Sequence, residues 1–464
     1  MTNVAISILP VAVLVFMLTV VKSAAWKAAL AALVVGSIEA IAFNGLSLQD
    51  IARCTMNGTA TGLFPIGLII VAALFTYAVT VESGAVDEIK SGLKKLSSDD
   101  RFFVLLTAWG FGNFMEGMAG FGTAVAIPCA ILVGAGFDPV KAVLCCLVAN
   151  TTPTAFASAG VPTMVLATET GLEISPLTRM IAVLQLLVSA LSPIIILFIA
   201  DGWRGLKEKF LLALLAAAAF IVPWLTLAAT VGCELPNIVG GISAMVAMAL
   251  AGDFRKLDAK RQAWAWMPFG FVVATLGAAA LIDSRHLVSP GFLIIAAAFA
   301  GGLCQRVSAG RLVALLGGTC RKYYIALLTI CLVLALAKVM GKSGMTSCLA
   351  NALVSATGDA YAAVSSIVGA LGGFVTGSGT SSNVLFGSLQ ASIGNTEFEK
   401  LLFAAANIMG AGIGKMICPQ SIVLGCAAAG LAGRESEMMR KIAPYFLAVI
   451  AIASASTIAL AHWN

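Results

Sequence analysis

The chain has 464 residues, of which 60% are hydrophobic and 11% are charged, and its mean hydropathy is +1.00. No soluble domain of this length can bury so much apolar surface, so the composition predicts an all-α polytopic membrane protein. Continuous apolar runs of about 20 residues indicate helices, since a transmembrane β-barrel would alternate apolar and polar residues. The net charge of +6 resides in short connectors between these runs, which argues against nucleic-acid binding.

The first half begins with two apolar runs, and the N-terminus is expected to form a first span rather than a cleaved signal. A polar connector, Asn44–Asn57, precedes the third run, and an amphipathic surface segment, Glu82–Asp100, follows it. Two interrupted units come next. The predicted spans and units are Val4–Val21, Ala24–Phe43, Thr59–Val81, Arg101–Gly136 (interrupted), Pro139–Ala167 (broken at Asn150–Pro162), Leu177–Ala200, Phe210–Thr230 and Leu235–Ala251.

The second half has a similar organisation. The predicted segments are the spans Trp264–Ile282, Leu287–Leu303 and Lys322–Met340, an amphipathic piece Ser343–Thr357, the interrupted unit Tyr361–Ile393, Phe398–Gly430 (broken at Asn407–Pro419) and Ile442–Leu460. We expect one transmembrane transporter domain over 1–464, with two corresponding cores at 101–200 and 361–460.

The basic connectors predict the orientation, because lysine and arginine favour the cytoplasmic side. They are Lys22–Lys27, Lys90–Arg101, Arg204–Lys209, Arg255–Arg261, Arg306–Lys322 and Arg434–Lys441. All six fall on one side if each glycine-rich unit is a re-entrant hairpin and each broken segment crosses once. The chain then makes about twelve crossings with both termini outside. The two hairpins enter from opposite sides, so the halves are predicted to be inverted copies.

The stretch Gly112–Ala124 holds four glycines and the carboxylate of Glu116 between long apolar runs. An ionisable group at bilayer depth usually faces a cavity or a partner, and glycines there free backbone groups that hydrocarbon cannot satisfy. We therefore expect a helix that stops mid-membrane, a turn and a restarting helix. The stretch Gly372–Val384 aligns with it without a gap. The later breaks also correspond, since Asn150 to Pro162 and Asn407 to Pro419 have the same spacing.

Glycine- and proline-interrupted runs at corresponding places in two halves indicate a transporter's binding site. Helix N-termini at such breaks suit a carboxylate, and hydroxyl or amide side chains add hydrogen bonds. A small anionic solute fits this site better than a lipid, a drug or a nucleotide. The predicted substrate-binding side chains at or near the breaks are Thr123, Asn150, Thr151, Thr152, Thr154, Ser381, Ser382 and Asn383.

Two buried charges have alternative interpretations. Glu116 either carries a coupling proton, since burial favours a neutral carboxyl, or caps the restarting helix; both roles can coexist. Lys415 either holds the substrate carboxylate, pairs with Glu116, or satisfies the freed carbonyls of its own broken helix.

Other polar residues have simpler explanations. Lys338 and Glu39 lie near span ends, where snorkelling to the interface explains them. Arg179 remains a candidate substrate or gating residue, whereas Glu82 begins the surface segment and has no expected transport role. The 11 cysteines are interpreted as small core or lipid-facing residues, and neither His286 nor His462 has a ligand cluster. No metal site, cofactor or hydrolase triad is predicted, so the chain is not expected to be an enzyme.

Several motifs, in order from about Phe114 to Glu437, resemble those of the bacterial lactate permease family. They are Phe114–Thr123, Ala149–Pro153, Glu234–Pro236, Ser343–Met345, Gly377–Asn383, Gly414–Ser421 and Gly430–Glu437. Gln420 and Ser421, from the Gly414–Ser421 motif, are two further predicted substrate-binding residues. The resemblance implies uptake of L-lactate or related 2-hydroxy monocarboxylates such as glycolate and D-lactate by proton symport in the bacterial inner membrane. It also implies inverted repeats with re-entrant hairpins and elevator-type alternating access.

The sequence thus predicts a secondary transporter whose partners are a small carboxylate, a proton and the lipid bilayer. A sodium-coupled carboxylate transporter of the same architecture is the main alternative, with Asn150, Asn383 and unwound carbonyls as candidate ligands for Na⁺. A channel or a membrane enzyme is a third. The oligomeric state is left open, with a homodimer as one option.

Overall fold

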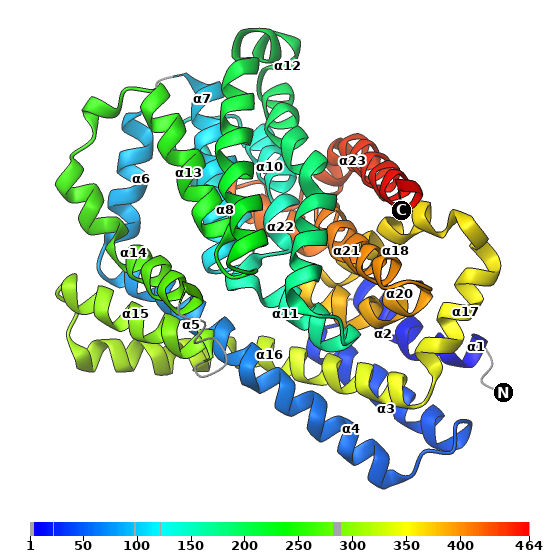
Figure 1. Ribbon diagram of the computed structural model, residues 1–464. Helices are drawn as coiled ribbons and strands as arrows, with labels where there is room; N and C mark the ends of the chain where they lie inside the picture. The colour runs from blue at the N-terminus through cyan, green and yellow to red at the C-terminus, as the bar shows by residue number, and fades with distance from the viewer. Residues whose placement is uncertain (1–3, 22, 97–98, 121, 282–288, 464) are drawn as a thin grey trace.

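The computed structural model describes residues 4–21, 23–96, 99–120, 122–281 and 289–463, and every regular element in these ranges is a helix, which confirms the all-α prediction (Figure 1). The predicted span ends Ile282 and Leu287, and His286 between them, lie outside the described residues. The elements are α1 (Val4–Ser7), α2 (Leu9–Thr19), α3 (Ala25–Ala42), α4 (Leu48–Thr61), η1 (Gly62–Gly67), α5 (Leu68–Glu82), α6 (Ala85–Lys95), α7 (Asp100–Val104), η2 (Leu105–Phe111), α8 (Gly112–Met118), α9 (Thr123–Gly134), α10 (Pro139–Ala149), η3 (Thr152–Thr154), α11 (Ala157–Thr170), α12 (Ile174–Thr230), α13 (Pro236–Ala251), η4 (Phe254–Lys256), α14 (Ala259–Leu281), α15 (Pro290–Cys304), α16 (Ala309–Lys342), α17 (Met345–Thr357), η6 (Gly358–Ala360), α18 (Tyr361–Thr376), α19 (Gly379–Ser382), η7 (Asn383–Gly387), α20 (Ser388–Ile393), α21 (Glu397–Gly414), α22 (Pro419–Ala428) and α23 (Glu435–Trp463).

Several helices are suited to a membrane by length and composition. Helices α21 and α22, bent by 40° at a short break, would form one further span if they cross together. Helix α12 bends at Asp201–Gly202 and again at Lys209, so it supplies both spans predicted between Leu177 and Thr230. In the described part of the chain, the helical runs that are individually long and apolar enough are Ala25–Ala42, Leu48–Glu82, Ile174–Thr230, Ala309–Lys342 and Glu435–His462.

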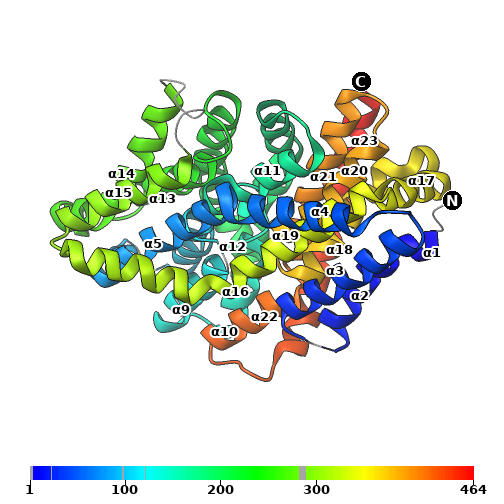
Figure 2. The same cartoon turned by 90° about the horizontal axis from the view of Figure 1, so that it is seen from below.

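Helices α2, α3, α4, α5 and α16 pack together along one side of the molecule, and we call this group the arm (Figure 2). The α4–α16 contact is close because glycines of the first helix run meet backbone of the second. A Cβ on Gly58 would approach the Ala335 backbone to 2.5 Å, and one on Gly62 would approach the Cys331 Cα to 2.9 Å. Small residues at such contacts are typical of helices that associate within membranes.

The structure corrects two predictions about the start of the arm. The predicted connector Asn44–Asn57 is helical from Leu48, because Ser47 and Asp50 form a reciprocal capping box that starts α4. The predicted span Thr59–Val81 is interrupted, since Phe64 has non-helical backbone angles within η1. A residue that precedes proline, here Pro65, is sterically disfavoured in the helical region.

Residues 100–134 form a helical hairpin, which we call hairpin 1. Its first arm runs from α7 to α8, its tip contains Ala119, Gly120 and Gly122, and its second arm is α9. The two arms pack against each other. Its second arm ends at the same end of the molecule as its beginning, where Lys94 Nζ donates to the Gly134 carbonyl at 3.3 Å. Hairpin 1 therefore starts and ends at one end of the molecule.

A charged network fixes the base of hairpin 1 to the bend of α12. Arg101 forms ion pairs with Asp99, Asp201 and Glu208, and Lys209 pairs with Asp99 at 3.0 Å. Partial burial opposes ionisation of Asp99, but hydrogen bonds from Arg101 and Lys209 hold the pKa of this carboxyl well below its usual range. Two of the basic connectors thus lie at one end, as their common cytoplasmic placement requires.

Residues 361–393 form the corresponding hairpin 2, with α18 as one arm, a tip at Gly377–Ser378, and α19, η7 and α20 as the other. Tyr361 at its start donates to Gln390 near its end at 2.7 Å. Its base lies at the opposite end of the first part of α12 from that of hairpin 1. Ser388 donates to the Glu169 carbonyl, just before α12 begins, whereas Arg101 contacts Asp201. The helix between these points is about 40 Å long.

Hairpin 2 packs closely on α21 through two pairs of glycines. Gly369 and Gly373 of α18, four residues apart, face Gly410 and Gly414 of α21, and a Cβ on any of them would overlap backbone of the opposite helix. This is the GxxxG arrangement, used on both sides of one contact. Hairpin 2 and α21 therefore form a single close-packed unit.

We predict that Gly410→Ala destabilises the protein by about 1–3 kcal/mol, because the added methyl group overpacks the α18–α21 contact. Gly317 of α16 is a matched control, since a Cβ there meets nothing within 4 Å. Gly317→Ala should stabilise by up to about 1 kcal/mol through helix propensity. Thermal unfolding in detergent measures both variants, and equal behaviour of the two would contradict the predicted packing.

Candidate functional site

Four breaks in the helices meet around one cavity of about 260 Å³. It lies close to the lower end of the roughly 300–1,000 Å³ range of ligand pockets, which suits a small solute. The breaks are the tips of hairpins 1 and 2 and the interruptions between α10 and α11 and between α21 and α22. The arm supplies the remaining wall, including Leu14, Ile70, Thr329 and Val333. The cavity thus lies between the broken helices and the arm.

The tip of hairpin 1 depends on its glycines. Gly120 and Gly122 have positive φ angles of 62° and 82°, which side chains other than that of glycine rarely adopt. A Cβ on Gly122 would also lie 2.6 Å from Leu424 Cδ1, so the leucine side chain would have to move. Thr123 Oγ1 donates to the Gly120 carbonyl at 2.8 Å and closes the turn. The predicted stop, turn and restart of the helix are confirmed here.

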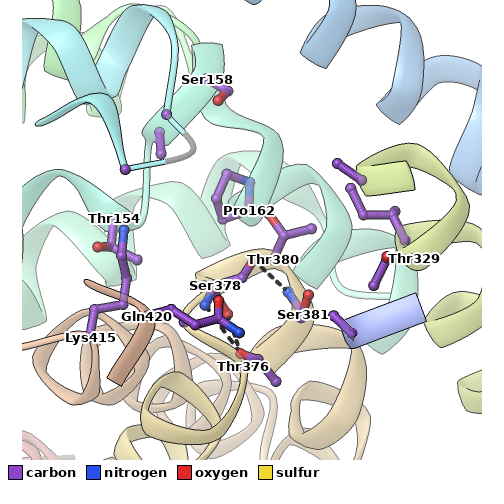
Figure 3. A pocket seen from close by; sticks show the side chains of 18 of the residues that line it. Thr154, Ser158, Pro162, Thr329, Thr376, Ser378, Thr380, Ser381, Lys415 and Gln420 are labelled. Carbon is purple, nitrogen blue, oxygen red and sulfur yellow. Dashed lines mark hydrogen bonds between the residues drawn. The ribbon is translucent and has the colours of Figure 1, made fainter. Parts of the chain in front are cut away.

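The tip of hairpin 2 is a turn at Gly377, whose φ is 65°. Ser378 caps the restarting helix by accepting from the Ser381 N–H at 3.2 Å. Thr376 Oγ1 accepts from the Ser378 N–H and donates to its carbonyl, which fixes the tip. The hydroxyls of Thr380 and Ser381 have no hydrogen-bond partner among the described residues, and both side chains line the cavity. Figure 3 shows Ser381 opposite Thr329 of the arm.

The first broken helix is held open by three side-chain amides. Gln185 donates to the carbonyls of Thr151 and Thr152, at 3.2 and 2.7 Å. Asn237 donates to the Pro153 carbonyl, and Asn383 of hairpin 2 donates to the Pro162 carbonyl at 2.8 Å. Each amide donates to a carbonyl within or just beyond the break. This satisfies backbone groups that hydrocarbon could not.

Three consecutive residues within this break, Ser158, Ala159 and Gly160, have left-handed backbone angles. Ser158 Oγ donates to the Ala119 carbonyl at 3.1 Å and so joins the break to the tip of hairpin 1. Ser158 also lines the cavity, together with Thr154 and Pro162 (Figure 3). The left-handed turn therefore places one hydroxyl at the cavity wall and fixes its orientation.

The break in the second broken helix is shorter than predicted. Helix α21 continues to Gly414, and only Lys415–Cys418 separate it from α22. The predicted start at Asn407 is wrong, because this amide is satisfied inside a regular helix. Asn407 donates to Asn383 at 2.9 Å and accepts from Gln390 at 2.9 Å. The amides form a chain from the base of hairpin 2 to the first broken helix.

Glu116 and Lys415 form a buried ion pair in the cavity wall. Lys415 Nζ lies 2.7 Å from Glu116 Oε1, and the two side chains are only 7% and 2% exposed. The second carboxylate oxygen has no hydrogen-bond partner among the described residues. The pair joins hairpin 1 to the second broken helix, which is the pairing considered for Lys415 from the sequence. Among the described residues, no backbone N–H is seen to donate to Glu116, and α9 begins without a side-chain cap.

The remaining predicted site residues divide into two groups. Thr154, Ser381, Gln420 and Ser421 line the cavity with the ion pair. The others lie behind this wall, where their contacts are structural: Thr123 closes a tip, Thr151 donates to Val148, Thr152 contacts Ser192, Asn150 stands at the end of α10, Ser382 donates to Gly369, and Asn383 bridges to Pro162.

The sequence did not identify several residues that line the cavity. Ser158, Thr376, Ser378 and Thr380 are hydroxyl side chains beside the tip and break glycines, so their proximity to glycine was an available signal. Thr329 lies in the middle of an apolar helix of the arm, and no sequence pattern relates it to the breaks.

The structure also locates the other charged residues. Snorkelling is wrong for Glu39, which is buried, and incomplete for Lys338, which pairs with Glu169 of α11 at 3.0 Å. Arg179 is exposed and donates to Ser175, away from the cavity. Glu82 pairs with Arg311 at 2.8 Å on the surface.

Comparison with known proteins gives a consistent result. The family model of L-lactate permease matches residues 3–276 and 269–463. An L-lactate permease of Streptococcus iniae is 34% identical, with 84% of this chain and 90% of that protein covered. An L-lactate permease of Escherichia coli K12 is 31% identical, covering 94% and 91%. A glycolate permease of the same strain is 34% identical, covering 82% of each.

The fold is similar to the crystal structure of the Alcanivorax borkumensis YdaH transporter, with a TM-score of 0.50, 15% identity and 88% of each chain covered. At this identity the likeness concerns the fold alone. The relatives by sequence are permeases and not enzymes, in agreement with the prediction that the chain is not an enzyme. With matches of this extent along its length, this multi-pass membrane protein belongs to the L-lactate permease family.

Proposed function

We propose that this protein imports L-lactate or a related 2-hydroxy monocarboxylate, such as glycolate or D-lactate, by proton symport across the bacterial inner membrane. The names of its relatives support this substrate class. The observation that carries the proposal is the Glu116–Lys415 ion pair in the wall of a small cavity, 2.7 Å apart and almost fully buried. These are the only charged side chains among the described residues that line it.

The cavity offers matching groups for a 2-hydroxy acid. Lys415 and the N-terminus of α22, with Gln420 and Ser421 in its first turn, suit the carboxylate, since a helix N-terminus carries partial positive charge. The unpartnered hydroxyls of Thr380 and Ser381 suit the substrate hydroxyl. The apolar wall from the arm suits the short alkyl group. A longer or doubly charged acid finds neither the space nor a second cation.

The ion pair explains why a proton would accompany the anion. With both partners charged the pair is neutral, so an incoming carboxylate that takes Lys415 leaves Glu116 as an uncompensated buried charge. Two like charges about 4 Å apart repel by about 4 kcal/mol at an effective dielectric constant of 20. A proton on Glu116 removes that repulsion. Anion and proton would therefore bind together, and the loaded site would be neutral during its passage.

Alternating access would follow from the arrangement of hairpins. We infer that hairpins 1 and 2 are re-entrant, enter from opposite sides, and belong to inverted cores at 101–200 and 361–460. Their bases lie at opposite ends of the first part of α12, which supports this inference. The cavity lies between these cores and the arm, as an elevator-type movement of the cores along the arm would require.

The direct test is counterflow and uptake of labelled lactate in proteoliposomes. An inward proton gradient should drive accumulation, with no dependence on sodium. Glycolate and D-lactate should compete, and a dicarboxylate should not. Sodium-dependent uptake without proton dependence would instead favour the sodium-coupled alternative, and flux without any ion coupling would favour a channel.

Glu116→Gln should abolish proton-driven accumulation but retain lactate exchange, because the amide is permanently neutral. Exchange in this variant should also lose its pH dependence. Glu39→Gln is the matched control, since Glu39 is a buried glutamate that does not line the cavity. Normal proton-driven accumulation by Glu116→Gln would exclude Glu116 as the coupling group.

Lys415→Met should reduce lactate binding at least about tenfold and lower the melting temperature, since removing one partner of a buried pair costs about 3–5 kcal/mol. The double variant Glu116→Gln/Lys415→Met should recover most of the stability but none of the transport. Equal losses of stability in the single and double variants would show that the two charges are not energetically coupled.

A further inference from the structure

A second cavity, of about 350 Å³, lies outside the proposed transport site, between α6, α13 and α14. Figure 1 shows α6 beside these two helices. Its wall is apolar, with Leu93, Met245 and Phe269 among the lining residues. The one lining amide, Gln262, already donates to the Glu88 carbonyl at 3.0 Å. An apolar cavity of this kind does not hold water well and takes apolar ligands.

One end of this cavity has a basic rim. Leu96, at the end of α6, and Leu257, before α14, both line the cavity, and the Asp253 N–H donates to the Leu96 carbonyl at 3.0 Å. This contact brings the two basic connectors of the sequence together. The exposed basic side chains beside these lining residues are Lys94, Lys95, Arg255, Lys256, Lys260 and Arg261, against two acidic ones, Asp253 and Asp258.

Three of the six cations already have partners, and two of these partners are acidic. Lys256 pairs with Asp253, Arg261 lies 3.5 Å from Asp258, and Lys94 donates to the uncharged Gly134 carbonyl. The remaining three cations, Lys95, Arg255 and Lys260, have no acidic partner among the described residues. The nearby Asp99 is held by Arg101 and Lys209. The rim therefore has an excess of positive charge at one end of this apolar cavity, which we call the groove.

We propose that this groove binds an anionic phospholipid, with an acyl chain between α6, α13 and α14 and the phosphate at Lys95, Arg255 and Lys260. Both parts of the ligand are needed to explain the site. A free phosphate leaves the apolar wall uncovered, and a zwitterionic lipid leaves the three cations uncompensated. Basic clusters beside an amphipathic or transmembrane helix are a known means of recognising anionic headgroups.

The position of the groove gives the lipid a route to influence transport. Helix α6 lies in the chain between α5 of the arm and α7 at the base of hairpin 1. A lipid bound between α6 and α14 would stabilise the position of α6 against α14. Binding itself does not depend on the proposed substrate or on proton coupling, so the two proposals can fail separately.

The groove can be filled by substitution at Gly270. This residue lines the groove, and a Cβ on it would meet nothing within 4 Å. Gly270→Phe should therefore occupy the space of the acyl chain without disturbing the fold. Gly318→Phe on α16 is the matched control, since its Cβ also has open space but lies away from the groove.

The experiment is native mass spectrometry of the purified full chain titrated with phosphatidylglycerol or phosphatidylcholine. We expect phosphatidylglycerol to bind the wild type, and the triple variant Lys95→Gln/Arg255→Gln/Lys260→Gln to bind at least about tenfold more weakly. Gly270→Phe should show a similar loss. Gly318→Phe and the charge control Lys207→Gln/Arg321→Gln/Arg440→Gln should bind as the wild type does.

Three results would overturn the proposal. Equal binding of the two lipids would remove the claim of headgroup selectivity. Undiminished phosphatidylglycerol binding by the triple variant would remove the assigned cations. Undiminished binding by Gly270→Phe would show that the lipid does not enter the groove. Thermal unfolding of every variant in detergent verifies that a loss of binding does not reflect a loss of fold.

Discussion

A helix that is broken inside a membrane leaves backbone N–H and C=O groups that hydrocarbon cannot satisfy, and the rest of this structure depends on how the protein satisfies them. The first broken helix uses amides from three other elements, Gln185, Asn237 and Asn383. Because these amides lie in α12, α13 and hairpin 2, the break can persist only when the surrounding helices are assembled. Local unwinding here is therefore a property of the whole fold.

The same requirement explains why so few predicted polar residues reach the cavity. Thr151 and Asn383 sit at the breaks, as expected, but their side chains donate to backbone carbonyls, and the Thr152 hydroxyl contacts Ser192. The polar groups left unpartnered among the described residues at the cavity include the hydroxyls of Thr380 and Ser381 and the second carboxylate oxygen of Glu116. The site thus has an inner frame of amides and threonines and a separate lining that faces the cavity.

Much of this arrangement could be predicted from the sequence, because glycine, proline and charge are unusual in apolar runs. Those signals located both tips, the first break and the two buried charges. They failed at Asn407, whose burial in a regular helix depends on Gln390 and Asn383. They also gave no indication of the arm's contribution, since Thr329 and Leu14 meet the breaks only through folding. Local patterns reveal where a helix stops, whereas distant contacts decide which side chains face the cavity.

The composition of the arm wall has one further consequence. Among the described residues of that wall, Thr329 is the single polar side chain, and its hydroxyl already donates to Ile325 within its own helix. In the proposed elevator-type movement, a substrate bound only to the cores would therefore break almost no hydrogen bonds with the arm. Such a movement would have a smooth energy profile, without deep intermediate minima.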